Sequence, residues 1–171
     1  METWDAIRAR RNVRRFSDRP IASADLDRIL EAGWRSPSSV NKQRWDFILC
    51  TDRSQLQELS SHSRWAGHVA GAAAAVALIL PHSDDPDVNE SLDLDLGQVT
   101  ISMMLAAADL GIGSCHAALE DQEPIRRLLG YPEDRVCALL ISLGYPADRP
   151  LVPIKRPKRR PLDEVVHRDH W

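Results

Sequence analysis

The chain has 171 residues with 43% hydrophobic side chains, a size typical of one domain with a substantial core. Its formal net charge of -3 and pI of about 6.1 exclude an overall positive field of the kind that holds nucleic acid or an anionic membrane. The three cysteines are widely spaced without a C-x-x-C pattern, which argues against a disulfide framework or a structural zinc site and favours a reduced, cytoplasmic protein.

The first fifty residues contain two helical patterns and one strand pattern. Apolar residues at helical spacing predict amphipathic helices over Glu2–Arg11 and from Ser23 to Leu30, with Ser23 as the N-cap of the second. The cluster Pro37–Ser39 interrupts this pattern. Trp45–Cys50 then alternates as a strand does, and a third helix begins within Thr51–Ser54. The polar residues before Trp45 are therefore expected on a loop that leads into a strand.

The middle of the chain is strongly apolar. Ala73–Leu80 indicates a buried strand, although its alanines suit a helix equally well, and the apolar run around it is too short to cross a bilayer. Pro81–Asn89 is expected to be a polar surface loop. Leu92–Leu110 has almost no polar face, so we expect a helix that is buried on most sides. Asp93 and Asp95 fit the start of that helix, where acids complement its dipole, better than a metal site.

The last third alternates strands with a short helix and ends in a tail. The pattern predicts a strand over Ser114–Ala118, a helix over Pro124–Leu129 and a core strand over Val136–Gly144. Five prolines between Pro146 and Pro161 prevent long regular structure, so we expect a tail wrapped over this domain or a partner. The alternation of helices and strands without a linker or repeat indicates a single α+β or α/β sandwich.

Four polar stretches, far apart in the sequence, together suit a flavin that carries a phosphate. Arginines can hold phosphate oxygens, serines and amides can bond the edge of a heterocycle, and glycines permit close backbone approach. Each stretch also has an ordinary structural explanation, as a basic helix end, a Ser–Asn turn, a helix C-cap or a basic tail. The stretches are Arg10–Arg14, Pro37–Trp45, Leu110–His116 and Lys158–Pro161.

Other ligands fit these residues less well. His116 follows Cys115, but no second histidine stands at metal-ligand spacing, so no metal is expected. The glycines after the long helix do not form the G-x-G-x-x-G fingerprint of a dinucleotide fold. Lys155–Arg160 could be a basic tail for nucleic acid, yet prolines interrupt it and acidic residues follow it. We therefore expect neither a nucleic-acid partner nor a membrane.

In this order the four stretches resemble the nitroreductase family of FMN-dependent oxidoreductases, and the resemblance covers nearly the whole chain. That family has Arg-Arg-Ser-x-Arg after the first helix, Pro-Ser-x-x-Asn-x-Gln-Pro-Trp before a strand, Leu-Gly-x-Gly-Ser-Cys after a long buried helix, and a basic stretch before Pro-Leu-x-Glu-Val-Val. This chain departs from the family pattern at Asn12, at Arg44 and at Ala118 and Leu119. Arg44 is expected to add charge near the pocket, and Leu119 is expected to narrow the room for the backbone to approach the flavin.

The resemblance implies an α+β, nitroreductase-like three-layer sandwich with a central, mostly antiparallel sheet flanked by helices. Residues 1–171 would form a single FMN-binding domain in an intertwined homodimer, with residues 146–171 as an extended C-terminal arm on the partner subunit. The phosphate, ribityl chain and pyrimidine edge would be held by Arg10, Arg11, Asn12 and Arg14, and the phosphate clamp would be completed by Lys158 and Arg160. The other subunit would contribute Pro37, Ser38, Ser39, Asn41 and Gln43. The isoalloxazine would lie against the backbone of His116, Ala117, Ala118 and Leu119.

The activity that the resemblance implies is hydride transfer from NADH or NADPH through flavin N5 to a nitroaromatic, quinone or similar small-molecule acceptor, by a ping-pong mechanism. No side-chain acid or base is obligatory in this scheme, and Arg14 would stabilise the anionic reduced flavin. The alternative is a flavin-binding storage or sensing protein of the same fold with little turnover. Leu119 and a pocket without the helical cover of larger family members motivate that alternative.

Overall fold

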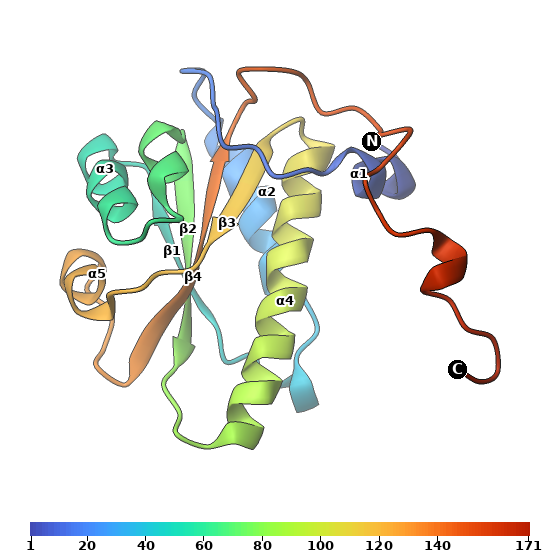
Figure 1. Ribbon diagram of the computed structural model, residues 1–171. Coiled ribbons are helices and arrows are strands. Elements are labelled where there is room, and N and C mark those ends of the chain that lie inside the picture. Colours follow the sequence, from blue (N-terminus) through green and yellow to red (C-terminus); the bar gives the residue numbers. More distant parts are fainter.

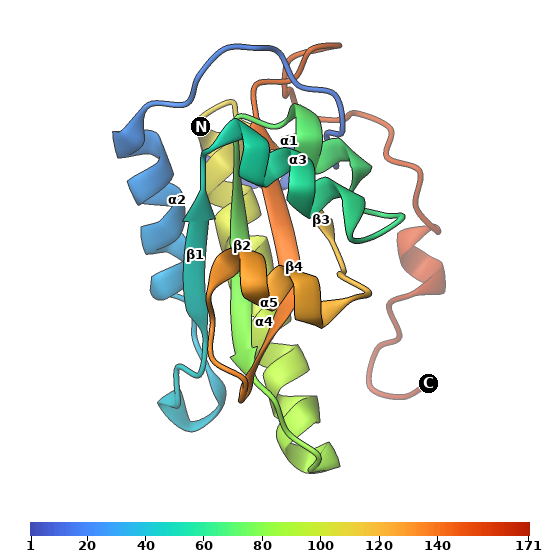
Figure 2. The ribbon, with the colours of Figure 1, turned by 90° about the vertical axis from the view of Figure 1, so that its left-hand side faces the viewer.

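The computed structural model describes residues 1–171 as three layers, with a sheet between helices on both faces (Figure 1). One face is covered by α2 (Ser23–Trp34) and α4 (Pro86–Asp109), and the other by α3 (Arg53–Ser61) and α5 (Gln122–Leu129), which stand in front of the sheet in Figure 2. A short helix, α1 (Thr3–Ala9), packs against α4. The expected α+β three-layer sandwich is confirmed.

The sheet is antiparallel throughout, in the order β1-β2-β4-β3. The inner strand β2 carries a continuous apolar run because both of its faces are covered by helices. Alternate side chains of β2 enter the core under α2 and α4 or the core under α3 and α5, which settles this segment as a strand. The strands are β1 (Asp46–Cys50), β2 (Ala74–Pro81), β3 (Gly113–Ala117) and β4 (Arg135–Gly144).

The sheet divides the interior into two apolar cores. Ile29 of α2 and Met103 of α4 are fully buried on one side, and Leu56 of α3 and Ile125 of α5 are fully buried on the other. Burying a side chain of this size contributes about 1.5–3 kcal/mol. Gly33 lets α2 approach α4, because a Cβ there would overlap the side chain of Met103. Each core is therefore formed between the sheet and one pair of helices, and Gly33 allows the helices of the first pair to approach closely.

The long helix begins earlier than the sequence suggested. Asp85 caps α4 by accepting a hydrogen bond from the N–H of Asp87 at 2.9 Å, and Pro86 suits the first helical turn. The expectation of a loop as far as Asn89 is therefore wrong. Asp93 and Asp95 consequently lie inside the helix, so the helix-start interpretation of this pair is wrong as well.

One further expectation about helices needs correction. Ser23 is the first residue of α2 and caps nothing, since the preceding Ala22 occupies the N-cap position without a side-chain hydrogen bond. The helix α4 is buried on most sides, as expected, but Leu94 is 61% exposed and Ile101 is 42% exposed. An apolar strip of α4 therefore faces outward. None of the helices is both long and apolar enough to span a membrane.

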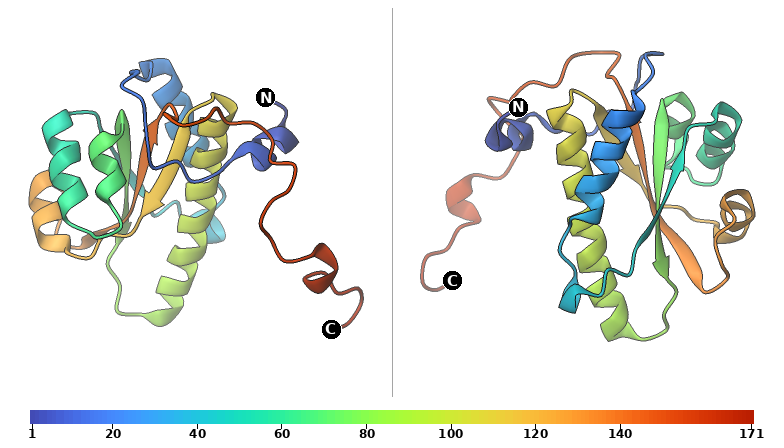
Figure 3. Two further views of the ribbon diagram at one scale, coloured as in Figure 1. Left: turned by 45° about the horizontal axis from the view of Figure 1, so that its top comes forward. Right: turned by 180° about the vertical axis from the view of Figure 1, so that it is seen from behind.

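After β4 the chain crosses α1 and then leaves the body of the domain. The N–H of Ile154 donates to the carbonyl oxygen of Arg8 at 3.0 Å, and every residue from Ile154 onward is exposed. One short turn, Leu162–Glu164, is the arm's regular structure. Figure 3 shows α1 and this arm on the side of α4 that faces away from the sheet. The tail is irregular, as its prolines predicted.

Gly113 at the start of β3 has no room for a side chain. A Cβ there would lie 2.7 Å from the Cβ of the buried Val13. We expect Gly113→Ala to lower the free energy of unfolding in urea by about 1–3 kcal/mol, because a packed core must shift. Gly71→Ala is the matched control, since nothing lies within 4 Å of a Cβ at Gly71. Equal stability of the two variants would contradict this packing.

Candidate functional site

The first basic stretch runs beside strand β3. It begins where α1 ends at Arg10, and the N–H of Val13 donates to the carbonyl oxygen of Ser114 at 2.9 Å, next to a parallel bridge between Asn12 and Ser114. This pairing buries Val13 and leaves the side chains of Asn12 and Arg14 exposed. The stretch therefore presents its polar side chains along the edge of the sheet.

A cavity of about 280 Å³ joins the two ends of the chain. The cations Arg10, Lys158 and Arg159 form no ion pair, and Arg10 Nη1 donates to Asn12 Oδ1 at 3.4 Å. Three unpaired cations around one cavity suit an anion with several oxygen atoms, such as a phosphate. The cavity is lined by Arg10, Arg11, Asn12, Ile154, Pro157, Lys158 and Arg159.

Two of the expected phosphate ligands are engaged elsewhere. Arg11 Nη2 donates to the carbonyl oxygen of Arg149 at 2.7 Å and to Asp148 Oδ1 at 3.3 Å. The backbone N–H of Arg149, together with Arg11, lowers the pKa of Asp148. Arg160 donates to the carbonyl oxygen of Glu164 at 3.1 Å, and Arg159 rather than Arg160 is the C-terminal arginine that lines the cavity. Arg11 therefore fixes residues 148–149, near the start of the C-terminal arm.

A second cavity, of about 350 Å³, lies at the C-terminal end of β3. Its walls combine the cation Arg14, which has no ion pair, with the indole of Trp65 and small side chains of β3. Trp65 is 61% exposed, and the guanidinium of Arg64 lies 5.0 Å from its ring centroid. Such walls suit a planar ring with negative charge at its edge. The lining residues are Arg14, Trp65, His116, Ala117, Ala118 and Leu139.

A chain of hydrogen bonds lies behind this cavity. Ser142 Oγ donates its one proton to the carbonyl oxygen of Cys115 at 3.1 Å. It must therefore accept a hydrogen bond from Nδ1 of His68, which lies 2.9 Å away. Burial lowers the pKa of His68, and the charges of Arg14 and His116 lower it further. At neutral pH, His68 is therefore uncharged and carries its one ring proton on Nδ1. Our sequence reasoning missed His68 and Trp65, because the segment that carries them has the composition of an ordinary surface loop.

The cysteines are buried thiols. Burial raises the pKa of Cys115, although Arg14 and Arg10 oppose the shift. Burial also raises the pKa of Cys50 to about 11 and the pKa of Cys137 to about 12. A protonated thiol is a poor nucleophile. The pair Cys115 and His116 therefore does not form an activated nucleophile and base.

The polar loop of the second stretch is held in a strained conformation. Val40, Asn41 and Gln43 have φ angles of 52°, 53° and 50°, in the left-handed region, which asparagine tolerates but which costs residues such as valine and glutamine about 1–2 kcal/mol each. The N–H of Gln43 donates to Ser38 Oγ at 2.9 Å. Ser39 donates both its N–H and its hydroxyl to the buried Asp95 of α4, at 2.8 Å and 3.0 Å.

Arg44 does not add free charge to the pocket, contrary to the expectation. Its side chain is 17% exposed, its Nη2 donates to Ser91 Oγ at 2.6 Å, and the same nitrogen lies 3.7 Å from Asp95 Oδ2. The charge of Arg44 is therefore directed at α4, where Asp95 balances it. Leu119 likewise packs against the core under α3 and α5 and is absent from the lining of the second cavity.

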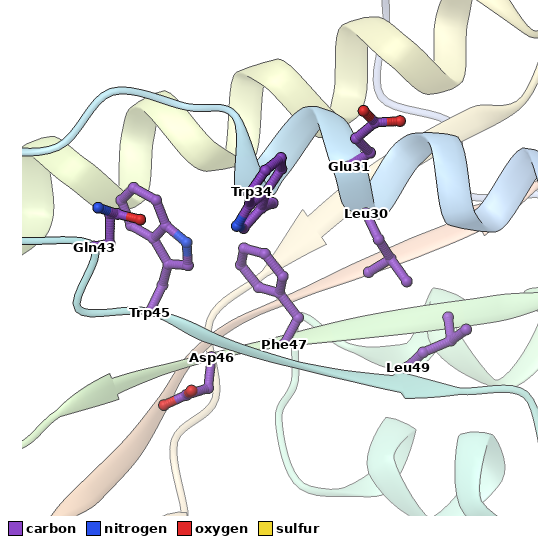
Figure 4. A pocket seen from close by; sticks show the side chains of 8 residues that line it. All are labelled: Leu30, Glu31, Trp34, Gln43, Trp45, Asp46, Phe47 and Leu49. Atoms are coloured by element: carbon purple, nitrogen blue, oxygen red, sulfur yellow. The ribbon is translucent and has the colours of Figure 1, made fainter. Parts of the chain in front are cut away.

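The loop also borders a groove of about 640 Å³ between α2 and β1. Figure 4 shows Trp34 above Phe47, with Gln43 and Trp45 at one end of the groove. Its charged residues are the acids Glu31 and Asp46, so this groove does not suit an anion. The complete lining is Leu30, Glu31, Trp34, Gln43, Trp45, Asp46, Phe47 and Leu49.

The two expected halves of the site are far apart in one chain. The loop is bonded to Asp95, whereas the first stretch packs beside Ala108 near the other end of α4. Thirteen residues of helix separate these positions by about 20 Å. In Figure 1 the loop lies at the lower end of α4, and the chain after α1 passes its upper end. The cavities described above contain residues of one half or of the other.

A three-layer α+β domain that has a cationic cavity next to a cavity with an aromatic wall is suited to binding an anionic ligand that contains a planar ring. Comparison with known proteins identifies the family. The model of the nitroreductase family matches residues 7–79 and 66–145. A relative from Archaeoglobus fulgidus, named NADH dehydrogenase/NAD(P)H nitroreductase, is 33% identical over 99% of each chain. The chain belongs to the nitroreductase family.

More distant proteins are similar to this chain in sequence or in fold. The NADPH-flavin oxidoreductase of Vibrio harveyi is 25% identical, over 99% of this chain and 74% of its own. The solved structure of an FMN-dependent nitroreductase from Clostridium difficile is similar with a TM-score of 0.83 and 24% identity, over 97% of this chain and 98% of that one. The expected family and fold are thus confirmed.

The neutral state of His68 makes stability depend on pH. Because burial lowers its pKa, the unfolded chain binds a proton there more readily than the folded protein. The stabilisation is complete above the ordinary pKa of about 6.5 and is lost as the pH falls through the lowered value. His68→Asn keeps an N–H donor for Ser142 but does not titrate. We expect urea unfolding to show a larger loss of stability from about pH 7.5 to about pH 5 in the wild type than in His68→Asn.

The matched control for this measurement is His82→Asn, which removes an exposed histidine outside the hydrogen-bond chain. It is expected to follow the wild type. An equal loss of stability in the wild type and His68→Asn would show that His68 does not titrate as described.

Proposed function

We propose that this protein is an NAD(P)H-dependent flavin oxidoreductase that holds FMN along the Arg10–Arg14 stretch. The observation that carries the proposal is the meeting of two basic stretches from opposite ends of the chain at one cavity, beside a second cavity with an aromatic wall. The names of the relatives from Vibrio harveyi and Clostridium difficile, which include flavin or FMN, support it.

The residues around the two cavities fit the parts of FMN. Arg10 and Lys158, with Arg159 or Arg160, would hold the phosphate, because guanidinium and ammonium groups donate charge-assisted hydrogen bonds. Asn12 would bond the ribityl chain. The ring would lie at the second cavity, near the backbone of His116, Ala117, Ala118 and Leu119 and beside Arg14. Among the charged groups, Arg14, Lys158 and Arg159 are exposed, Arg10 is half-buried, and Arg160 alone has an ion pair.

The chemistry that FMN supplies when bound is acceptance of hydride from NADH or NADPH at N5 and its transfer to a nitroaromatic, quinone or similar acceptor, in a ping-pong cycle. Arg14 contributes a positive charge where negative charge develops on reduction. The protonated Cys115 and the neutral His68 add no competing nucleophile or charge. The protein's part is therefore to bind, orient and stabilise charge.

We infer that the functional unit is a homodimer. In one chain the loop with Ser38, Ser39 and Asn41 lies about 20 Å along α4 from the Arg10–Arg14 stretch, so a second copy is needed to bring such a loop to the same ligand. The exposed Leu94 and Ile101 of α4 offer an apolar surface for that copy. The arm of residues 146–171, exposed from Ile154 onward, would pack on the partner subunit.

Flavin binding is tested by incubation with FMN, gel filtration and anaerobic addition of NADH and then NADPH. We expect retained flavin that loses its visible absorbance with at least one donor. Arg10→Met and Lys158→Met should each raise the dissociation constant of FMN by about 10-fold or more, because each removes a charge-assisted hydrogen bond. Arg127→Met, an exposed cation on α5, is the control.

The absorbance result separates the two candidate functions. Retained flavin that stays oxidised with both donors would support the storage or sensing alternative. A preparation that retains no flavin would contradict both.

The homodimer is tested by sedimentation equilibrium. We expect a mass of about twice the chain mass of 19.2 kDa. Ile101→Asp buries a charge in the proposed interface, so it should yield monomers and raise the dissociation constant of FMN by about 10-fold or more. Gln57→Asp, on the exposed face of α3, adds the same charge as a control. A monomeric wild type that retains FMN would contradict the homodimer.

A further inference from the structure

A single buried carboxylate ties the polar loop to α4. Asp95 is 1% exposed, and its Oδ1 accepts hydrogen bonds from the N–H and from the hydroxyl of Ser39, at 2.8 Å and 3.0 Å. A buried carboxylate without such donors is strongly unfavourable. The bonds to Asp95 therefore fix the start of the loop against the helix, and they leave Ser39 with only oxygen lone pairs to offer a ligand.

Arg44 ties the other end of the loop to the same helix. Its Nη2 donates to Ser91 Oγ at 2.6 Å and lies 3.7 Å from Asp95 Oδ2. Ser91 and Asp95 are four residues apart and so lie on one face of α4. Residues 39–44 are thus held at both ends by adjacent turns of one helix. The proline of the family pattern at this position could not form either contact.

The backbone between these anchors would not keep its shape alone. Val40 and Gln43 have φ angles of 52° and 50°, in a region that neither residue type favours and that is especially unusual for a β-branched side chain. Such conformations persist where the surrounding structure enforces them, and they cluster at sites that bind ligands. The result is an apex at which Val40 is 91% exposed.

We propose that Asp95 and Arg44 are positioning residues that hold this loop in the shape with which it grips the FMN of a second copy. The inference rests on the proposed function and adds to it two residues that lie behind the binding surface. We call the contacts of Asp95 with Ser39 and of Arg44 with Ser91 the clamp. Without it the loop would have to become ordered when FMN binds, and this entropic cost would weaken the affinity for FMN. The clamp does not touch the reacting atoms, so the hydride-transfer rate at saturating FMN should change little.

The first measurement is an FMN titration of the full chain. Asp95→Asn keeps the size of the side chain but removes its charge, and Arg44→Met keeps an unbranched apolar stem but removes the cation. Each is expected to raise the dissociation constant of FMN by about 10-fold, with kcat at saturating FMN within about 2-fold of the wild type. The double variant should be no weaker than the worse single variant, because both changes break one unit.

Controls distinguish a clamp from a general loss of stability. Arg126→Met removes a partly buried arginine that pairs with Glu123 on α5, on the opposite face of the sheet, and should leave FMN affinity unchanged. Arg44→Lys retains a cation and should restore most of the affinity that Arg44→Met loses. Thermal unfolding of each variant reports whether the fold is intact.

The second measurement does not require flavin. Hydrogen exchange of the backbone amides of Ser39 and Gln43 should be at least about 10-fold faster in Asp95→Asn and Arg44→Met than in the wild type. Unchanged exchange at both amides would overturn the clamp, whatever the flavin result. Faster exchange with FMN affinity within about 2-fold of the wild type would overturn its positioning role. A wild type that retains no FMN would instead overturn the proposed function.

Discussion

The burial of β2 and β4 on both faces is the constraint on which the rest of the structure depends. Strands without a polar face need helices on both sides, so the polar residues that could bind a ligand are confined to the ends and edges of the sheet. At one end Gly113 of β3 is paired with Gly144 of β4, and these glycines make room for Val13 and Phe16. The N-terminal stretch and the root of the arm therefore meet at this end.

Charge distinguishes the region along β3 from an ordinary protein surface. The chain has a net charge of -3, yet Arg10, Arg14, Lys158 and Arg159 lie around two neighbouring cavities without acidic partners. Like charges held close together by the fold repel one another, and an anion bound among them relieves that repulsion. A ligand that binds only the folded state also stabilises it. A ligand held by Lys158 and Arg159 would also give contacts to the arm, which is exposed from Ile154 onward.

The fold could be predicted from the sequence because its signals are local. The apolar run of β2 and the helical spacing of α2 and α4 are properties of adjacent residues, and four polar stretches in order carry the resemblance to the family. The contacts of Trp65 and His68 could not be predicted, because tertiary packing alone brings them to β3. Asp95 was misread for a related reason: acids near an expected helix start suit capping, and only the true start at Pro86 places this carboxylate in the interior.

A site that takes its loop from one chain and its cations from another ties ligand affinity to assembly. In a two-fold dimer each loop would serve the partner's cations, so loosening one loop would weaken the site of the other chain. The clamp of Asp95 and Arg44 lies wholly within one chain, and its effect would nevertheless appear at the partner's cofactor. Affinity for FMN should then fall when the protein is diluted below the dissociation constant of the dimer, since the monomer holds only half of the ligand's contacts.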